Sequence, residues 1–559
     1  MTQIKNENLQ QNKGIKLLKD RFFLNPEWSN IDQAMQLLKS ALVSLGQLQG
    51  KSPIYPDNIG IPKISDIIDQ SVIPDNLAAN PEIKLKELPY MVQRTVKSGN
   101  PYMVKNLIPT VSLPALSAYF AISTFMGNGV TGEDSGQTLL AEIACVSAIS
   151  KLAGISPKKS AGVFTFGGTG TNMYGIKLGL AKILPNHSME GIKDNVAIIE
   201  SYPSHYSHKT AADWLGIGQN NCIKVKSNLD QTTNLKELER TCDEILSSDK
   251  KLVCINAVGG TTSGLGIDNI KDIYEMRKRL IKRHNLDYTP HIHMDSVLGW
   301  AYLNFINYDF KQNKLKFSKA AVLQIKKILE RIKTIKYADS FGVDFHKTGY
   351  VAYNSSLIIV KNKKDLMKLQ RDVNEMTPLF HDDEAYNPGK YTLETSRSSA
   401  NILATWIALE TFGQEGYQIL LGNAIENGIK FKSLFDKHIK DGFFVANQQC
   451  IGPDVFVRCY PPDIDAKINY YKELSDSVLL EKNTEYISQF FKWLDKKMPL
   501  KPNGFAISKS SAAIYTNTGV PMVALRIYPL SPYITYETDQ ILVDRIVQAK
   551  HKFDKIYKK

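Results

Sequence analysis

A histidine–lysine pair, and an acid roughly fifty residues before it, are the residues most suited to chemistry. His346 and Lys347 close the stretch ADSFGVDFHK, and Asp295 ends the short apolar stretch HIHMD. A lysine held near a cation in a dry pocket has a depressed pKa and attacks aldehydes. A carboxylate paired with a pyridine nitrogen keeps that ring protonated, so that the ring can accept electrons. Together these residues are what a chain needs to hold pyridoxal 5'-phosphate (PLP).

A glycine-rich segment could bind the phosphate of such a cofactor. GGTGTN, Gly167–Asn172, stands between an expected strand, AGVFTF, and an expected helix, NMYGIKLGLAKI. Free backbone N–H groups and the positive end of the helix dipole attract phosphate at such a point. The segment matches neither GxxxxGK[ST] nor GxGxxG, which counts against an NTPase or a nicotinamide enzyme. A tight glycine turn that serves packing alone explains the segment about equally well.

Two more turns follow expected strands. His205 lies just past NVAIIES, at the kind of strand end where sheet enzymes bind ligands, and its ring could stack on a flat cofactor. A loop histidine that caps the next helix is the simpler alternative. Thr261 and Thr262 follow KLVCINAV, and their hydroxyl groups could bind a ligand or merely begin a turn.

The stretch HIHMD also permits a metal site. In a strand, His291, His293 and Asp295 would share one face and could bind zinc or iron. The sequence offers no further His, Asp or Glu set with ligand spacing, so we expect no metal and assign Asp295 to the pyridine nitrogen. The six cysteines show no CxxC spacing, which argues against a zinc ribbon or a disulfide framework and fits a reducing compartment.

The elements that position these residues alternate along the chain. Between about 106 and 425, short β-branched runs are separated by helix-length segments, which is typical of a largely parallel sheet with crossover helices. We expect residues 1–105 to form an N-terminal helical arm, 106–425 a large PLP-binding domain, and 426–559 a small α/β domain. Expected strands of the last domain are DVFVRCY and MVALRIYPL.

The composition excludes few functions. Of the 559 residues, 43% are hydrophobic and 22% charged, and the net charge is +13. The lysines are scattered and no nucleic-acid motif occurs, so we expect a solvated surface and no nucleic-acid partner. The polar N-terminus does not read as a signal peptide. The apolar run from Leu107 to Met126 contains Pro109 and Pro114, which favours a buried helix with a kinked entry over a membrane span. A cytoplasmic protein without a membrane partner is expected.

The order of the five segments identifies a family resemblance. The chain resembles the group II PLP-dependent amino acid decarboxylases of fold type I, whose superfamily also contains the sphingosine-phosphate lyases. ADSFGVDFHK, HIHMD, GGTGTNMYG and the later ETSRSSANILATWIALETFGQEGY carry the resemblance, over residues 100–425 and more loosely beyond. It implies an α/β fold whose large domain has a mostly parallel seven-stranded sheet, joined by a smaller C-terminal α/β domain and an N-terminal helical segment. It also implies a homodimer.

The resemblance assigns roles to individual residues. Lys347 would form the internal aldimine, Asp295 would bind the pyridine nitrogen, and His205 would stack on the ring as a third catalytic residue. The cofactor-binding set that it implies consists of Thr169 and Gly170 through their backbone N–H groups, Thr261, His346, and the three catalytic residues His205, Asp295 and Lys347.

The implied reaction is decarboxylation of an L-amino acid to its amine and CO2 through a quinonoid intermediate. The alternative is carbon–carbon cleavage of a phosphorylated amino alcohol, as in the lyase branch. The family's proton-donating tyrosine follows the lysine in a loop; here Tyr386 and Tyr391 lie at unexpected spacings, and His381 is another candidate. Phe166 and Trp300 replace smaller residues and could reshape the pocket, and Arg397 could bind a carboxylate or begin a helix.

Overall fold

The computed structural model describes residues 13–557, apart from residues 49, 57–61, 79, 106, 108 and 373–385. Contacts divide the chain into two units. One consists of Met1–Met103 with Lys496–Ala506, and the other of Val104–Asp495 with Ile507–Lys559. Residue 425, the expected boundary between the large and small domains, falls inside helix α16 (Ser399–Asp436). The division at that residue therefore stays a prediction.

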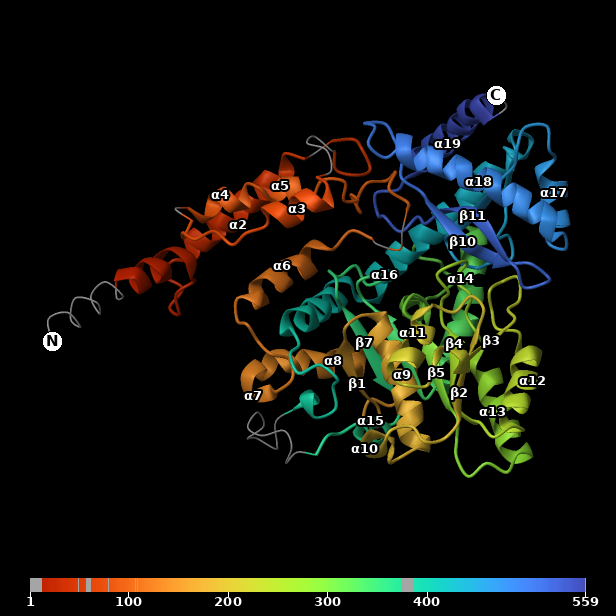
Figure 1. The fold of residues 1–559 in the computed structure, drawn as a ribbon, viewed down its shortest axis with the longest axis horizontal. Helices are drawn as coiled ribbons and strands as arrows, with labels where there is room; N and C mark the ends of the chain where they lie inside the picture. Colours follow the sequence, from red (N-terminus) through yellow and green to blue (C-terminus); the bar gives the residue numbers. More distant parts are fainter. Residues whose placement is uncertain are drawn as a thin grey trace. The chain divides into compact units, whose positions relative to one another are not determined.

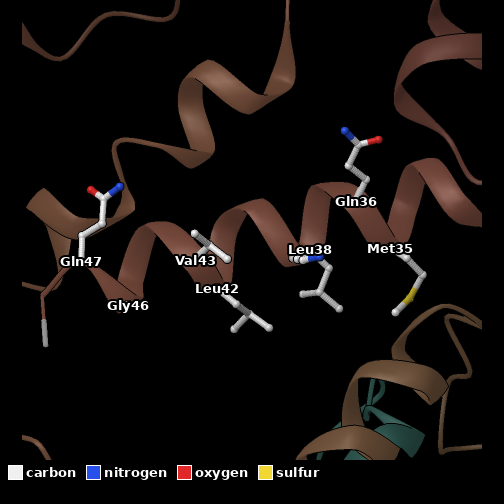
Figure 2. A pocket seen from close by; sticks show the side chains of 8 residues that line it. Met35, Gln36, Leu38, Leu42, Val43, Gly46 and Gln47 are labelled. Carbon is white, nitrogen blue, oxygen red and sulfur yellow. The ribbon is translucent and has the colours of Figure 1, made fainter.

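The first unit is built from helices. Residues 13–22 are helical, and α2 (Ile31–Gly46), α3 (Ile64–Gln70), α4 (Pro81–Leu85) and α5 (Leu88–Met91) follow. Met35, Leu38 and Leu42 project from one side of α2, where they line a hollow (Figure 2). Their spacing of three and four residues places them on one helical stripe. Met35 is 56% and Leu42 49% exposed, so part of this apolar stripe is open to solvent among the described residues.

A seven-stranded sheet forms the centre of the second unit (Figure 1). Its order is β1-β7-β6-β5-β4-β2-β3; β7 pairs antiparallel with β1 and β6, and the other pairings are parallel. The expected mostly parallel seven-stranded sheet is thereby confirmed. Its strands are β1 (Ala161–Thr165), β2 (Val196–Ser201), β3 (Cys222–Val225), β4 (Lys251–Val258), β5 (His291–Asp295), β6 (Ser340–Asp344) and β7 (Ser356–Val360).

One edge of this sheet collects the segments that the sequence singles out. Because β1 and β6 both run antiparallel to β7, β1 points the same way as the parallel strands. The carboxyl ends of these strands therefore share an edge, which is where open α/β sheets bind ligands. The segments that follow or end there are Gly167–Asn172 after β1, His205 after β2, Thr261 after β4, Asp295 on β5, and His346 with Lys347 after β6.

Helices cover both faces of the sheet. Val196 and Ile198 of β2 belong to a cluster with side chains of α9 (Gly168–Ile183) and α11 (Ser207–Trp214). Ala197 and Ile199 belong to another cluster, which includes side chains of α8 (Leu140–Leu152), α12 (Leu235–Leu246) and α13 (Ile270–Arg283). This alternation follows from the period of two in a strand. The α-helices beyond residue 104 include α6 (Leu113–Ser123), α7 (Gly132–Ser135), α8 (Leu140–Leu152), α9 (Gly168–Ile183), α10 (His187–Glu190), α11 (Ser207–Trp214), α12 (Leu235–Leu246), α13 (Ile270–Arg283), α14 (Lys319–Ile332), α15 (Lys363–Met367), α16, α17 (Ala466–Glu473), α18 (Ser477–Lys497) and α19 (Tyr536–Tyr557).

Helix α9 lies close enough to the sheet to exclude a side chain. A Cβ atom on Gly175 would lie 2.3 Å from the His293 ring on β5. The helix begins directly after Gly167, whose φ of 105° is accessible mainly to glycine. The tight packing and the glycine turn together fix where the N-terminus of α9 stands at the sheet edge.

A second, antiparallel sheet has the order β10-β11-β9-β8. Its strands are β8 (Phe443–Val445), β9 (Val455–Cys459), β10 (Ser508–Tyr515) and β11 (Pro521–Ile527). Strands β9 and β11 match the expected DVFVRCY and MVALRIYPL, while β8 and β10 were not anticipated. A fully buried ion pair between Arg458 on β9 and Glu473 on α17, 2.6 Å apart, ties this sheet to its helices.

The apolar run from Leu107 to Met126 differs from its expectation. Helix α6 forms from its middle, with Pro114 in the first turn, where a missing N–H costs nothing. The helix is not buried, however: Leu113 is 76% and Phe120 37% exposed, and Ala115 is its buried residue; Phe125 and Met126, just after the helix, are 63% and 87% exposed. Hydropathy identified an apolar helix but could not say what covers it. Among the described residues, no helix combines the length and apolar character needed to span a membrane.

Candidate active site

Lys347 stands one turn beyond the end of β6, beside a buried carboxylate. Its Nζ atom lies 2.8 Å from Oδ2 of Asp344, and its side chain is 19% exposed. Burial alone would lower the pKa of Lys347, but the charge and hydrogen bond of Asp344 outweigh burial and raise it. The pKa of Lys347 is therefore raised in the protein without its cofactor, and the depressed pKa expected beside a cationic cofactor stays a prediction. Ser356 Oγ donates to the other oxygen of Asp344 at 2.6 Å and fixes the carboxylate.

Asp295 ends β5 with its carboxylate buried and oriented. Asn172, in the second turn of α9, donates to Asp295 Oδ2 at 3.0 Å, and its Oδ1 lies 3.1 Å from His293 Nε2. Burial would raise the pKa of Asp295, but the charges of His208 and His205 and the Asn172 bond lower it. Lys347 also lowers it, so the acid and the lysine lie within electrostatic reach. The carboxylate is ionised and ready to face a cationic group.

Behind Asp295 lies a chain of buried charges that the sequence did not reveal. His208 Nε2 is 3.9 Å from Asp295 Oδ2, and His208 Nδ1 is 2.9 Å from Glu200 Oε2. Burial would lower the pKa of His208, but the hydrogen bond and charge of Glu200 raise it. Lys224 approaches the second oxygen of Glu200 at 3.4 Å. His208, whose positive charge Glu200 favours, thus lies next to the Asp295 carboxylate.

His205 belongs to the same group of charges. Its Nδ1 lies 2.8 Å from Ser207 Oγ, which orients the ring. Burial lowers the pKa of His205, Asp295 raises it and Lys347 lowers it, so its ring stands near both residues. A largely neutral, oriented imidazole at this edge suits stacking on a flat ring.

The phosphate turn contributes backbone N–H groups. Gly168, Thr169 and Gly170 form the first turn of α9, where N–H groups have no partner within the helix. A Cβ atom on Gly168 would lie 3.0 Å from Asp344 Oδ2, so this turn adjoins the Lys347 ion pair. His346 is nearby: its Nε2 lies 3.5 Å from Asp344, while its Nδ1 bonds the Ser355 carbonyl oxygen at 2.9 Å.

Thr261 has a different set of contacts. Its hydroxyl donates to the Ser263 carbonyl oxygen at 2.6 Å and accepts from the Gly266 N–H at 2.7 Å. These bonds close the turn after β4. Among the hydrogen bonds of the described residues, none joins Thr261 to Lys347 or Asp295, so its place beside a cofactor stays a prediction.

The expected proton donors lie elsewhere. The Tyr386 hydroxyl donates to Glu142 at 3.1 Å and lies 3.4 Å from the Gly162 carbonyl oxygen. Gly162 is three residues before the end of β1, so this hydroxyl lies about 10 Å short of the sheet edge. Tyr391 bonds Tyr386, and burial raises its pKa to about 12. His381 lies outside the described residues.

Tyr353, which the sequence did not single out, stands beside the lysine. Its ring centroid is 4.2 Å from that of His346, and it interacts electrostatically with Lys347. Burial raises the pKa of Tyr353, so it carries its proton at neutral pH.

The structure shows the surroundings of Arg397, Trp300 and Phe166, which the sequence offers as residues that could bind a carboxylate or reshape the pocket. Arg397 pairs with buried Glu142 and donates to the Gly129 carbonyl oxygen at 2.9 Å, so its guanidinium is engaged by the protein. Trp300 is fully buried against Phe345, 5.0 Å away. It belongs to the core. Phe166 is 37% exposed and lines a cavity of about 160 Å3 beside the phosphate turn.

The HIHMD histidines bond protein groups. His291 and His293 both bond Ser340 Oγ, at 2.7 and 2.8 Å, and share their face of β5 with Asp295 as expected. Within the described parts of the chain, no group of three or more His, Cys, Asp or Glu side chains is placed to hold a metal ion.

Comparison with known proteins identifies the family. The family described as the pyridoxal-dependent decarboxylase conserved domain matches residues 73–457, well over half of the chain. The chain belongs to this family. It is 24% identical over 405 residues to the aspartate 1-decarboxylase of Aliivibrio fischeri, covering 70% of this chain and 66% of that protein. It is 26% identical over 250 residues to the L-tyrosine decarboxylase of Enterococcus faecium, covering 42% and 40%. The matched regions span less than two thirds of these relatives.

Solved structures extend the likeness to the whole fold. Mouse CSAD in its apo form superposes with a TM-score of 0.71 and 17% identity, covering 93% of this chain and 99% of that one. Oryza sativa TDC with PLP and tryptamine gives a TM-score of 0.71 and 14% identity, covering 95% and 99%. At these identities the likeness concerns the fold, and the expected fold type I architecture of this decarboxylase family is confirmed.

PLP is the cofactor of the pyridoxal-dependent decarboxylase family, and the residues present fit it. The first turn of α9 offers N–H groups without helical partners to a phosphate. Asp295 is an ionised, buried carboxylate fixed by Asn172, as a protonated ring nitrogen requires. Lys347 ends at the same sheet edge. Each chemical part of the cofactor thus has a matching group.

Proposed function

We propose that this protein is a PLP-dependent carboxy-lyase that converts an amino acid into its amine and CO2. The observation that carries the proposal is the convergence of Lys347, Asp295 and the N-terminus of α9 at one sheet edge. The matching relatives are named as decarboxylases, which disfavours the alternative of carbon–carbon cleavage.

Lys347 and Asp344 would carry out the first proton transfer. When bound, PLP supplies an electron sink that stabilises the negative charge left at Cα by departing CO2. The ammonium of Lys347 must lose a proton before its nitrogen can attack an aldehyde, and Asp344, 2.8 Å away, can receive it. Asp295 would keep a proton on the ring nitrogen, and Asn172 holds its carboxylate in place. His205 would stack on the ring, and the N–H groups of the phosphate turn would bind the phosphate.

Tyr353 is our candidate for returning a proton to Cα. It is protonated at neutral pH and stands next to His346 and Lys347. We expect Tyr353→Phe to lower kcat by about 100-fold, the order of a lost general acid. Tyr386→Phe serves as the control, because that hydroxyl bonds Glu142, and should leave kcat within about threefold. Equal losses in both variants would refute this assignment.

We also propose a homodimer in a reducing, cytoplasmic location, with the arm, large domain and small domain divided at 105 and 425. The exposed apolar side chains of α6 support an association between copies. All six cysteines are buried and free, which supports a reducing compartment. The two separate sheets support the division between large and small domains.

The activity is tested with purified full-length protein, PLP and a panel of L-amino acids. The relatives' names include aspartate, tyrosine and 2,4-diaminobutyrate decarboxylases, so the panel covers acidic, aromatic and basic side chains. We expect equimolar CO2 and amine from at least one member, and none with Lys347→Ala. A phosphorylated β-hydroxy amine tests the alternative. Aldehyde release from it, without CO2 from any amino acid, would overturn the proposal.

A further inference from the structure

A cavity of about 560 Å3 lies along one side of α9, away from the phosphate turn. Residues of α9, α10 and the end of α11 line it, together with residues 368–372 and 391–393. Met173 and Lys177 of its lining follow Gly168 by five and nine residues, which is about 8 and 14 Å along a helix. The cavity is therefore distinct from the site at the sheet edge.

The lining of this cavity carries more positive than negative charge. Lys177, Lys368 and Arg371 line it, against the single carboxylate of Asp372. The Arg371 guanidinium donates to backbone carbonyl oxygens, among them that of Gly389 at 2.9 Å. These neutral acceptors orient Arg371 but do not cancel its charge. Such a lining attracts anions.

The Lys177 ammonium and the Nε2 atom of His187 have no hydrogen-bond partner among the described residues. Lys177 is partly buried, and within the described residues no hydrogen bond or ion pair engages it. Burial lowers its pKa, with no carboxylate to oppose that effect. His187 is 8% exposed and donates from Nδ1 to the Leu184 carbonyl at 2.7 Å; its buried Nε2 has no partner in the described chain. Because Nδ1 carries the proton, Nε2 is a hydrogen-bond acceptor, and Lys177 is the group of this pair that can bind an anion. A partly buried cation without a partner is stabilised by a ligand that accepts its hydrogen bonds.

Another part of the lining is apolar, beside the polar side chains of Ser188, Gln370 and Thr392. Met173 and Leu215 form part of the wall, and Trp214, 76% exposed, stands at the rim. A volume of this size is typical of small-molecule sites, which combine apolar walls with a few polar groups. We propose that this cavity binds a small organic anion, whose carboxylate or phosphate head lies at Lys177 and whose apolar body packs on Met173, Leu215 and Trp214. The site goes beyond the proposed decarboxylation and does not require PLP.

Isothermal titration of the full-length protein tests the site with three probes: phenylacetate, phenyl phosphate and inorganic phosphate. We expect saturable, one-per-chain binding of at least one aromatic probe, and the better one identifies the preferred head group. Inorganic phosphate should bind at least tenfold more weakly, because it lacks the apolar body. Equal affinity for inorganic phosphate, or no binding of either aromatic probe, would overturn the proposal.

Variants locate the binding. Lys177→Met, which keeps the length of the side chain, should weaken the aromatic probe at least tenfold, and Lys177→Arg should stay within threefold of the wild type. Lys151→Met, at an exposed lysine of α8, is the matched control and should change nothing. Lys347→Ala should bind as the wild type does, which separates this site from the proposed active site. Unaltered affinity in Lys177→Met would refute the assignment.

Tryptophan fluorescence tests the site in protein that keeps Lys177, so this test does not depend on whether Lys177→Met folds. Trp214 is one of five tryptophans and stands at the rim of the cavity. Saturation with the aromatic probe should change tryptophan emission, and Trp214→Phe should abolish that change. A change that persists in Trp214→Phe would place the probe elsewhere and contradict the proposal.

Discussion

Asp344 sets the charge of Lys347 when no cofactor is bound. We expect Asp344→Asn to lower the pKa of Lys347, because burial is then opposed mainly by the smaller effect of Asp295. Since the raised pKa stabilises the folded state at neutral pH, the wild type should lose this stability as pH rises through the folded pKa of Lys347. The variant should lose less stability over that alkaline range.

NMR of 13C-labelled lysine in the cofactor-free protein measures the pKa of Lys347 directly. Ser356→Ala is the control, because it removes a hydrogen bond to Asp344 but keeps the carboxylate. A pKa of Lys347 that is the same in Asp344→Asn and in the wild type would contradict this account.

The Glu200–His208 pair should make stability depend on pH. The lowered pKa of Glu200 gives stability that is present above about pH 4.5 and lost as pH falls through the folded value. The raised pKa of His208 gives stability that is present below about pH 6.5 and lost as pH rises through its folded value. We therefore expect His208→Gln to cost about 3 kcal/mol near pH 5.5, where both groups are charged, and less near pH 8.5.

Urea unfolding of both proteins at the two pH values checks this prediction. Glu200→Gln should reduce the cost of His208→Gln in a double-mutant cycle, because the two residues act as a pair. The same loss of stability at both pH values would show that His208 acts through packing alone.

Single residues differ in how far the sequence reveals them. The sequence singles out Lys347, Asp295 and His205 because they stand at or just after strand ends in a fixed order. Asp344 is only three residues before Lys347 and could have been noticed from that spacing. Glu200 and His208 could not, because their meaning depends on a neighbour on another strand, Asp295.

At the scale of elements, the position of α9 should depend on Gly175. A Cβ atom there would overlap the His293 ring at 2.3 Å, so Gly175→Ala must push α9 away from β5. We expect a cost of about 1–3 kcal/mol in unfolding free energy and weaker PLP binding, because the phosphate turn begins the same helix. Gly14→Ala, where nothing lies within 4 Å of the added Cβ, should leave both quantities nearly unchanged.

Chemical denaturation and equilibrium PLP titration measure the two effects. Wild-type stability and PLP affinity in Gly175→Ala would show that the close packing of α9 does not position the turn.

The elements themselves were largely predictable, for physical reasons. Strands β1, β2, β4, β5 and β7 are runs of apolar and β-branched residues bounded by turn residues, and the sequence located them. Strands β3 and β8 have four and three residues, too few to show a pattern. The expectation that α6 is buried within this chain failed for another reason. Apolar composition predicts that a helix is covered, but it does not tell whether the same chain or a second chain covers it.

At the scale of the whole molecule, exposed apolar side chains predict self-association. Phe125 and Met126, after α6, are 63% and 87% exposed, and a surface of this kind is stable when a partner covers it. We expect sedimentation to give a dimer for the wild type and a shift to monomer in Phe125→Ser/Met126→Ser. Leu323→Ser, at a 57% exposed residue of α14, is the control. A wild-type monomer at micromolar concentration would contradict the dimer.

The central claim is that Lys347 is the residue that holds PLP, and one measurement tests it most directly. The purified protein is incubated with PLP, reduced with borohydride, digested and analysed by mass spectrometry. We predict one pyridoxyl group per chain, on the peptide that contains Lys347, and its loss in Lys347→Ala. Stoichiometric label on another lysine, or no stoichiometric label at all, would contradict the account.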